Sequence, residues 1–236
     1  GSENATALAY WKRGQCDPDA LPTDSHIAAG EAALRAALTV DFCAGLFLWT
    51  GIDYLGEPTP QSWPSRSSYF APVDMCGFPK DAFYLYKAQW TRSPIVHLFP
   101  HWNWEGREGS EIPVWCYTNC ESVELFLDGE SLGVKSNRAP EELHLEWRVP
   151  YRPGVLRAVG LMDGAKVCEC ERATAGAPAA LALSADRAAI RVDRGDAAFV
   201  TAAVLDSAGR LCPLADTTIE FAIEGEARLI GVDNGD

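Results

Sequence analysis

A tryptophan and two carboxylates lie at and just beyond the end of a short apolar run near residue 50. Trp49 ends the run that begins at Cys43, and Asp53 and Glu57 open the polar segment that follows. A tryptophan ring can stack on the apolar face of a sugar, and carboxylates accept hydrogen bonds from hydroxyl groups. The segment therefore predicts a sugar-contacting site in which Trp49 stacks and Asp53 binds hydroxyls. Two alternatives stay open: Trp49 could equally plug the top of a core, and loop solvation is the better interpretation of Glu57.

The cysteines and histidines show no pattern typical of a metal site. Eight cysteines are present, none in a C-x-x-C pair that could bind a metal together with any of the four histidines. We expect no metal and no cofactor, with a zinc site as the less favoured alternative. Reduced thiols packed as small apolar side chains are the better interpretation. They favour a reducing compartment and hence a cytoplasmic location, with a periplasmic one left open.

Length and charge narrow the class of protein. The chain has 236 residues, enough for one to three small domains, and 47% of them are hydrophobic. Its formal net charge of −13 argues against nucleic acid or anionic lipid as a partner, because polyanions repel each other. The longest apolar stretches are too short to span a membrane. The expected partners therefore include neither nucleic acid nor membrane.

Residues 1–99 mix helix and strand signals and must position Trp49. Residues 27–40 are rich in Ala, Leu and Glu and predict a helix. The apolar run 43–49 is typical of a strand buried on both faces. A long polar loop over 53–80 and a second helix over 82–90 follow. Helix, buried strand, loop and helix together indicate part of a β/α barrel.

Residues 100–176 and 177–236 are predicted to be β-structure. Val123, Leu125 and Leu127 recur at every second position and would share one face of a strand, and Leu143, Leu145, Trp147 and Val149 would share another. Asp128-Gly129 and Asp163-Gly164 predict tight hairpin turns. Residues 173–180 are a linker of small residues, and alternation resumes over 199–205 and 219–223. The sequence predicts an α/β plus all-β chain: a C-terminal part of a TIM barrel and two immunoglobulin-like β-sandwich modules, the last one truncated.

Several ordered motifs carry a resemblance to bacterial β-galactosidase-like members of glycoside hydrolase family 2. It covers nearly the whole chain and begins at Gly1-Ser2-Glu3-Asn4-Ala5-Thr6 and Arg13-Gly14. The motifs beyond these are Leu48-Trp49-Thr50-Gly51-Ile52-Asp53-Tyr54-Leu55-Gly56-Glu57-Pro58, Trp63-Pro64-Ser65-Arg66-Ser67-Ser68-Tyr69-Phe70, Gly77-Phe78-Pro79-Lys80-Asp81, His101-Trp102-Asn103-Trp104, Val123-Glu124-Leu125-Phe126-Leu127-Asp128-Gly129 and Ile230-Gly231-Val232-Asp233-Asn234-Gly235.

The resemblance implies a site and a reaction. Residues 1–99 would supply barrel strands 7 and 8 with the last helices, and Glu3 would match the nucleophile of a retaining β-glycosidase. Trp49 would line the sugar subsite, with Asp53 beside it, and the substrate would be a β-linked galactoside or oligosaccharide. The family's acid/base glutamate lies on a strand that this chain lacks. General acid help contributes about a hundredfold or more, so we expect the chain alone to be inactive.

Two other classes of function remain. The sandwiches could bind carbohydrate, or they could brace the barrel and build an oligomer interface, and we favour the second. Whether Trp102, Trp104 and Trp115 are exposed or buried discriminates between them. A partial barrel would expose Phe47, Leu48 and the helix over 27–40. The chain is therefore expected to form a homo-oligomer or to associate with the missing barrel portion.

Overall fold

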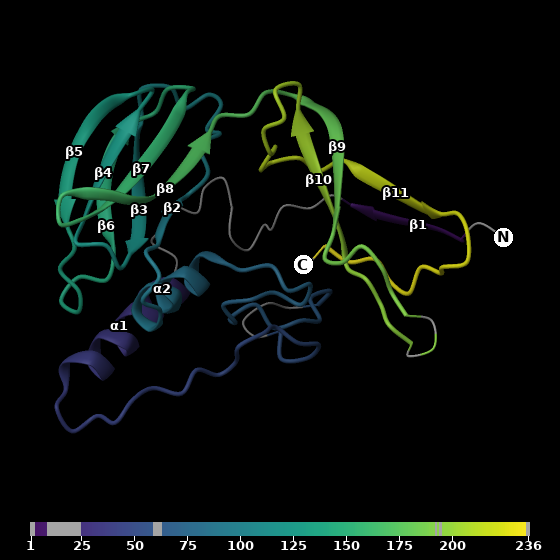
Figure 1. Ribbon diagram of the computed structural model, residues 1–236, viewed down its shortest axis with the longest axis horizontal. Coiled ribbons are helices and arrows are strands. Elements are labelled where there is room, and N and C mark those ends of the chain that lie inside the picture. The colour runs from purple at the N-terminus through teal and green to yellow at the C-terminus, as the bar shows by residue number, and fades with distance from the viewer. Residues whose placement is uncertain (1–2, 9–24, 59–62, 192, 194, 235–236) are drawn as a thin grey trace. The chain divides into compact units, whose positions relative to one another are not determined.

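The computed structural model describes residues 3–8, 25–58, 63–191, 193 and 195–234. Its two helices and eleven strands are shown in Figure 1. They are, in chain order, β1 (Glu3–Leu8), α1 (Ser25–Thr39), α2 (Asp81–Trp90), β2 (Val96–Phe99), β3 (Glu111–Thr118), β4 (Ser122–Leu127), β5 (Glu130–Ser136), β6 (Leu145–Pro150), β7 (Val155–Met162), β8 (Ala165–Ala173), β9 (Pro178–Ala185), β10 (Val200–Asp206) and β11 (Thr218–Ile223). The expected β-rich architecture with few helices is confirmed.

The chain divides into two compact units. The larger contains residues 12–174, and the smaller combines residues 1–11 with 175–234. The division at 174/175 falls within the segment predicted as a linker. The boundary predicted at residue 99 falls inside the larger unit, because β2 already belongs to the sandwich that follows.

Two antiparallel sheets form the sandwich of the larger unit. One has the order β2-β3-β6 and the other β5-β4-β7-β8. Asp128 and Gly129 join β4 to β5 with φ values of 51° and 84°, and Asp163 and Gly164 join β7 to β8 with 50° and 73°. Positive φ at both central residues is the geometry of a two-residue hairpin turn whose twist matches the flanking strands. Both predicted hairpin turns are confirmed.

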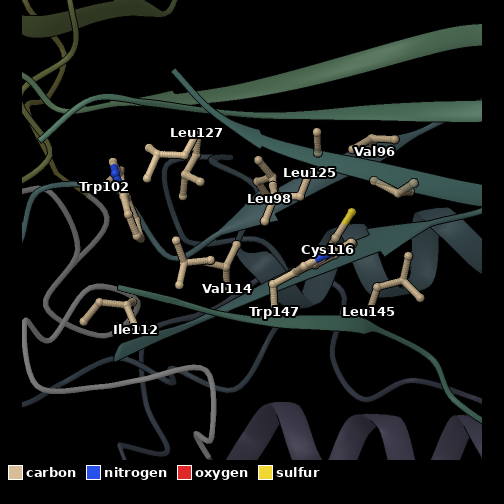
Figure 2. Close-up of a cluster of buried hydrophobic side chains, with 14 of the residues drawn as sticks. Val96, Leu98, Trp102, Ile112, Val114, Cys116, Leu125, Leu127, Leu145 and Trp147 are labelled. Carbon is tan, nitrogen blue, oxygen red and sulfur yellow. The ribbon is translucent and has the colours of Figure 1, made fainter. Parts of the chain in front are cut away.

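Alternate residues of the facing strands fill the space between the two sheets. Figure 2 shows side chains of β2, β3, β4 and β6 directed into this space. Val123, Leu125 and Leu127 are buried there, as their alternation predicted. The other buried members of this cluster are Val96, Leu98, Trp102, Trp104, Ile112, Val114, Cys116, Cys120, Leu145, Trp147, Val149, Tyr151, Leu156 and Ala158. We call this set the sandwich core.

A second core lies on the other face of the β2-β3-β6 sheet, where α1 and α2 pack (Figure 1). Its buried members are Leu34, Leu85, Tyr86, Ala88, Ile95, Phe99, Trp115, Tyr117 and Leu143. We call it the helix-side core. Strand β3 is thus covered on both faces, which explains its nearly continuous apolar sequence. Leu143 was expected to share a face with Leu145, but it precedes β6 and joins the helix-side core instead.

The strand predicted over 43–49 is wrong for this structure. The segment contains no strand, and the Phe47 side chain is fully exposed, whereas Leu46 and Leu48 are partly buried against the helix-side core. A strand buried on both faces needs a hydrogen-bonding neighbour and a layer on each side. Among the described residues no named strands pair in parallel, so the segment has no such neighbour.

The smaller unit contains two two-stranded antiparallel sheets, β1-β11 and β9-β10. Its buried cluster consists of Ala175, Val204, Cys212 and Ile219. Residues 3–8 were expected to end a parallel barrel strand, but here Glu3 to Leu8 pair antiparallel with Ile223 to Thr218. An unpaired strand edge offers free N–H and C=O groups to any β-prone segment, which accounts for this pairing.

Candidate functional site

The loop that carries Trp49 is organised around the buried carboxylate of Asp53. Its Oδ1 accepts hydrogen bonds from the Ser68 hydroxyl at 3.2 Å and the Ala71 amide at 2.9 Å. Its Oδ2 forms an ion pair with the Lys80 ammonium, which also donates to the Tyr69 carbonyl at 2.8 Å. Hydrogen bonds to an ionised carboxylate are stronger than hydrogen bonds between two neutral groups. Asp53 therefore fixes both ends of the loop, and both of its oxygens have partners.

Trp49 projects from this loop into solvent. Its side chain is 76% exposed, unusual for so large an apolar group. The ring meets Tyr54 edge-on at 6.4 Å between centroids, and Tyr54 meets Phe70 in the same way at 6.1 Å. The peptide bond between Trp49 and Thr50 is cis. The tryptophan ring is therefore accessible from solvent, and its stacking on a sugar stays a prediction.

Tyr54 and Glu57 form a hydrogen-bonded pair near Trp49. The phenol donates to Oε2 of Glu57, and this bond raises the pKa of Tyr54 above its ordinary value. Glu57 therefore has a local partner, in line with the loop role preferred for it.

A second exposed tryptophan in this region was missed as a site residue. Trp63 is 75% exposed, and the guanidinium of Arg66 lies 4.9 Å from the centre of its ring. A cation over an aromatic face is a favourable arrangement, and the ring of Trp63 stays accessible from solvent. The aromatic content of the segment was the available signal, but periodicity gives no information about exposure outside regular elements.

Helix α2 connects this loop to the sandwich. Lys80 is its N-cap residue, and the carboxylate of Asp81, the first residue of the helix, contacts Nε2 of His97 at 2.7 Å. Arg172 lies 3.4 Å from Nδ1 of His97. Because an arginine only donates, Nδ1 accepts and Nε2–H donates to Asp81. Burial lowers the pKa of His97, so the ring is a neutral link between α2, β2 and β8.

Helix α1 has its own buried polar contact with the sandwich. Oε1 of Glu31 accepts hydrogen bonds from the Tyr117 hydroxyl at 3.0 Å and from His144 Nδ1 at 2.8 Å. The His144 ring stacks on Trp115 at 3.6 Å. Burial is the main cause that raises the pKa of Tyr117, so its hydroxyl stays a donor. The three polar groups satisfy one another within an otherwise apolar interface.

Glu3 and the Trp49 loop lie in different units of the chain. Glu3 belongs to β1 in the smaller unit, whereas Trp49 and Asp53 lie in the larger one. Its role as a nucleophile stays a prediction. The sugar contact predicted for Asp53 also stays a prediction, since its carboxylate is turned toward the loop's own donors.

The three tryptophans that discriminate between sugar binding and bracing are buried, not exposed on the surface of the sandwich. Trp102, Trp104 and Trp115 have exposed fractions of 1%, 3% and 8%. The indole N–H of Trp102 donates to the Arg152 carbonyl, and that of Trp104 donates to the His101 carbonyl, both at 3.0 Å. None of the three rings can serve as a platform for a sugar. This test therefore favours a bracing role over carbohydrate binding by this face of the sandwich.

The described part of the chain contains neither a cluster of metal-binding side chains nor a membrane-spanning helix. No group of three or more His, Cys, Asp or Glu side chains there is arranged to hold a metal ion. No helix among the same residues is long and apolar enough to cross a membrane.

Family models match two segments of the chain. One, described as a domain of unknown function (DUF4982), covers residues 109–168, which lie in the sandwich of the larger unit. The other, described as glycoside hydrolase family 2 C-terminal domain 5, covers residues 181–236. The two matches fall on either side of the division at 174/175.

Known proteins resemble the chain over most of its length. The β-galactosidase BoGH2A of Bacteroides ovatus is 48% identical over 206 residues, which are 87% of this chain and 24% of that protein. A solved β-glycosidase from Bacteroides vulgatus is 36% identical with a TM-score of 0.73, over 78% of this chain and 23% of that one. A solved β-glucuronidase of glycoside hydrolase family 2 is 27% identical with a TM-score of 0.64, over 88% and 23%. The chain thus spans about a quarter of the length of these relatives.

Proposed function

Because the chain belongs to glycoside hydrolase family 2 as a C-terminal segment, we propose that it is part of a retaining β-glycosidase acting on β-linked galactosides. Residues 1–99 would complete the catalytic barrel, and residues 100–176 and 177–236 would be immunoglobulin-like sandwich modules. The galactoside assignment is supported by the relative with 48% identity, which is a β-galactosidase. Glucuronides are the competing substrates, since one of the similar solved structures is a β-glucuronidase.

The single observation that carries this proposal is the exposed Trp49 on a loop with a rigid base. Asp53 and Lys80 tie the ends of the loop together, and Lys80 leads directly into α2. Helix α2 packs on β2 and β3 through Leu85 and Ala88. A sugar-stacking ring contributes most when its support is ordered before the ligand binds. The sandwich would thus hold the Trp49 loop in place.

Each predicted site residue then has a defined chemical role. Glu3 would attack the anomeric carbon, and a carboxylic acid outside this chain, about 5 Å from the Glu3 carboxylate, would protonate the leaving oxygen. Trp49 would stack on the apolar face of the sugar in the transition state. Asp53 would act by holding the loop, or by binding a sugar hydroxyl if its contact with Lys80 opens.

Turnover by the polypeptide that contains this chain tests the proposal. Chromogenic β-galactoside and β-glucuronide substrates are compared first, and a higher kcat/KM is expected for the galactoside. Glu3→Gln should reduce turnover to background, because the amide cannot form the glycosyl-enzyme intermediate. Trp49→Ala should lower kcat/KM about tenfold, which corresponds to roughly 1.4 kcal/mol of stacking. Phe47→Ala is the matched control, since Phe47 is exposed on the same segment.

The outcomes separate the parts of this proposal. Full activity of Glu3→Gln would exclude Glu3 as the nucleophile while leaving the family assignment intact. Equal effects of Trp49→Ala and Phe47→Ala would remove the stacking role. A preference for the glucuronide would overturn the galactoside assignment alone.

We also propose that the isolated chain is inactive and associates with other barrel segments. Phe47 and Trp49 are exposed on the same segment as Leu55 and Phe42, an apolar surface suited to burial. Steady hydrolysis of a β-galactoside by the isolated chain would contradict the first statement. Monomeric behaviour in sedimentation at high concentration, with no complex formed on adding the remaining barrel segment, would contradict the second.

A further inference from the structure

Four of the cysteines gather at one corner of the sandwich. Cys116 lies on β3 and Cys120 in the connection to β4, and both belong to the sandwich core. Cys168 and Cys170 lie on β8 and pack against that core from its edge. The Sγ atoms of Cys120 and Cys168 are 3.5 Å apart. These two residues are 48 positions apart in the sequence, so the fold alone brings their sulfurs together.

Gly160 provides the space that the two sulfurs occupy. It lies on β7 opposite Cys168 in the β7–β8 register. A Cβ atom at Gly160 would come within 2.6 Å of the Cys120 sulfur and 2.9 Å of the Cys168 sulfur. Any larger residue would therefore displace both sulfurs, and the glycine lets them lie side by side.

The two cysteines differ in access to solvent. Cys120 is fully buried, whereas Cys168 lies on an edge strand and is partly exposed. A soluble oxidant can therefore reach Cys168 first, and Cys120 is placed to react second. Cys170, two residues along β8, has the Arg172 guanidinium at 3.2 Å from its sulfur instead of a second thiol.

We propose that Cys120 and Cys168 are a redox-sensitive pair that closes to a disulfide in the presence of a small disulfide oxidant. The Cys168 thiolate attacks the oxidant, forming a mixed disulfide and releasing one small thiol. The Cys120 thiolate then attacks the Cys168 sulfur and releases the second small thiol. The two protein thiols lose two electrons and two protons in total, and the oxidant disulfide is reduced to two thiols.

The geometry requires only a short movement. The sulfurs must approach from 3.5 Å to the bonded distance of about 2.0 Å. The bond would join β8, the edge strand of one sheet, to the connection between β3 and β4, where the chain crosses from the other sheet. It would therefore tie the two layers of the sandwich together at this corner.

Reaction should be slow near neutral pH and faster in alkali. Burial raises the pKa of Cys168 to about 12, so little thiolate is present at pH 7. Since the thiolate is the nucleophile, the rate should rise about tenfold per pH unit below that value.

Peptide mapping of the full chain tests the proposal. The folded protein is incubated with oxidised glutathione at mildly alkaline pH, quenched in acid, then unfolded and alkylated. We expect a non-reduced peptide that links Cys120 to Cys168 and a chain lighter by two hydrogen atoms. Cys43, Cys76 and Cys212 should all be alkylated, as should Cys116 and Cys170.

Variants provide the matched controls. Cys170→Ser should leave the Cys120–Cys168 link unchanged, whereas Cys168→Ser should abolish it. Gly160→Ala should slow its formation in protein that remains folded by circular dichroism. A stable glutathione adduct on Cys168 without closure would overturn the proposal, as would a link between any other two cysteines. Mapping the unmodified sequence gives this answer even if a variant fails to fold.

Discussion

The two units of the chain form strands equally well but bury very different amounts of apolar surface. In the larger unit two sheets face each other, and residues such as Leu98, Leu125 and Leu156 are completely buried between them. In the smaller unit Leu183 and Phe199, on and beside the β9–β10 hairpin, remain 67% and 70% exposed. Strand pairing alone satisfies backbone hydrogen bonds, but burial requires a second layer. Stability is therefore expected to reside mainly in the larger unit.

Truncating one leucine side chain in each unit should give the largest difference in stability between the two units. Leu98→Ala removes a completely buried side chain and should lower the free energy of unfolding by about 3 kcal/mol. Leu183→Ala, at an exposed position, should change it by less than about 0.5 kcal/mol. Urea unfolding followed by far-ultraviolet circular dichroism measures both, since the strands of both units contribute to this signal. Similar losses for the two variants would contradict the comparison.

The helix-side core offers a second contrast within the larger unit. Glu31→Ala leaves the Tyr117 hydroxyl and His144 Nδ1 without their acceptor and should cost about 2–3 kcal/mol. Glu31→Gln retains an acceptor oxygen and should cost clearly less. Arg35→Ala, on the exposed face of α1, is the control for helix propensity. Equal stability of the two Glu31 variants in urea unfolding would show that the hydrogen bonds do not matter.

Acid should weaken the larger unit through its buried histidines. Burial lowers the pKa of His101 to about 4, below the unfolded value of about 6.5. The unfolded state therefore binds more protons between these values, and stability present above pH 6.5 is lost as the pH falls toward 4. For His101 the loss should be about 2 kcal/mol at pH 5 relative to neutral pH. His101→Gln should flatten the pH dependence of urea unfolding, and an unchanged slope would refute this source.

Replacing a glycine in a tight turn should cost about the same free energy of unfolding in both units. Gly129 and Gly209 have φ values of 84° and 77°, which disfavour any residue with a Cβ atom. Gly129→Ala and Gly209→Ala should each cost about 1 kcal/mol, independent of the surrounding core. Thermal unfolding of the two variants measures the costs. A much larger effect at one turn would mean that packing rather than backbone conformation controls it.

Local patterns in the sequence predicted the elements whose partners lie nearby. Alternation at Val123, Leu125 and Leu127 and the Asp128-Gly129 turn give β4 and its hairpin with β5. The helix predicted over 27–40 is observed over Ser25–Thr39. In each case one face or one turn determines the element, so a window of a few residues contains the necessary information.

Features that depend on distant partners could not be predicted in this way. The apolar run 43–49 has the composition of a buried strand but carries no information about the neighbours a strand needs. The ion pair that Asp53 forms with Lys80 joins residues 27 positions apart, and no local pattern in the sequence indicates it. The exposure of Trp49 and Trp63 also depends on which segments cover them. These are properties of the assembled chain rather than of any short window.

Alternate residues of strand β3 belong to two different cores. Its even-numbered residues Ile112, Val114 and Cys116 face the sandwich core, whereas Trp115 and Tyr117 face the helices. Tolerance to substitution should therefore alternate along the strand according to two independent sets of neighbours. Among homologues, changes at even positions should co-vary with β4 and β7, and changes at odd positions with α1 and α2. The sequences of the sandwich and of the helical layer could then change independently. Strand β3, which both share, would show the changes of one at its even positions and of the other at its odd positions.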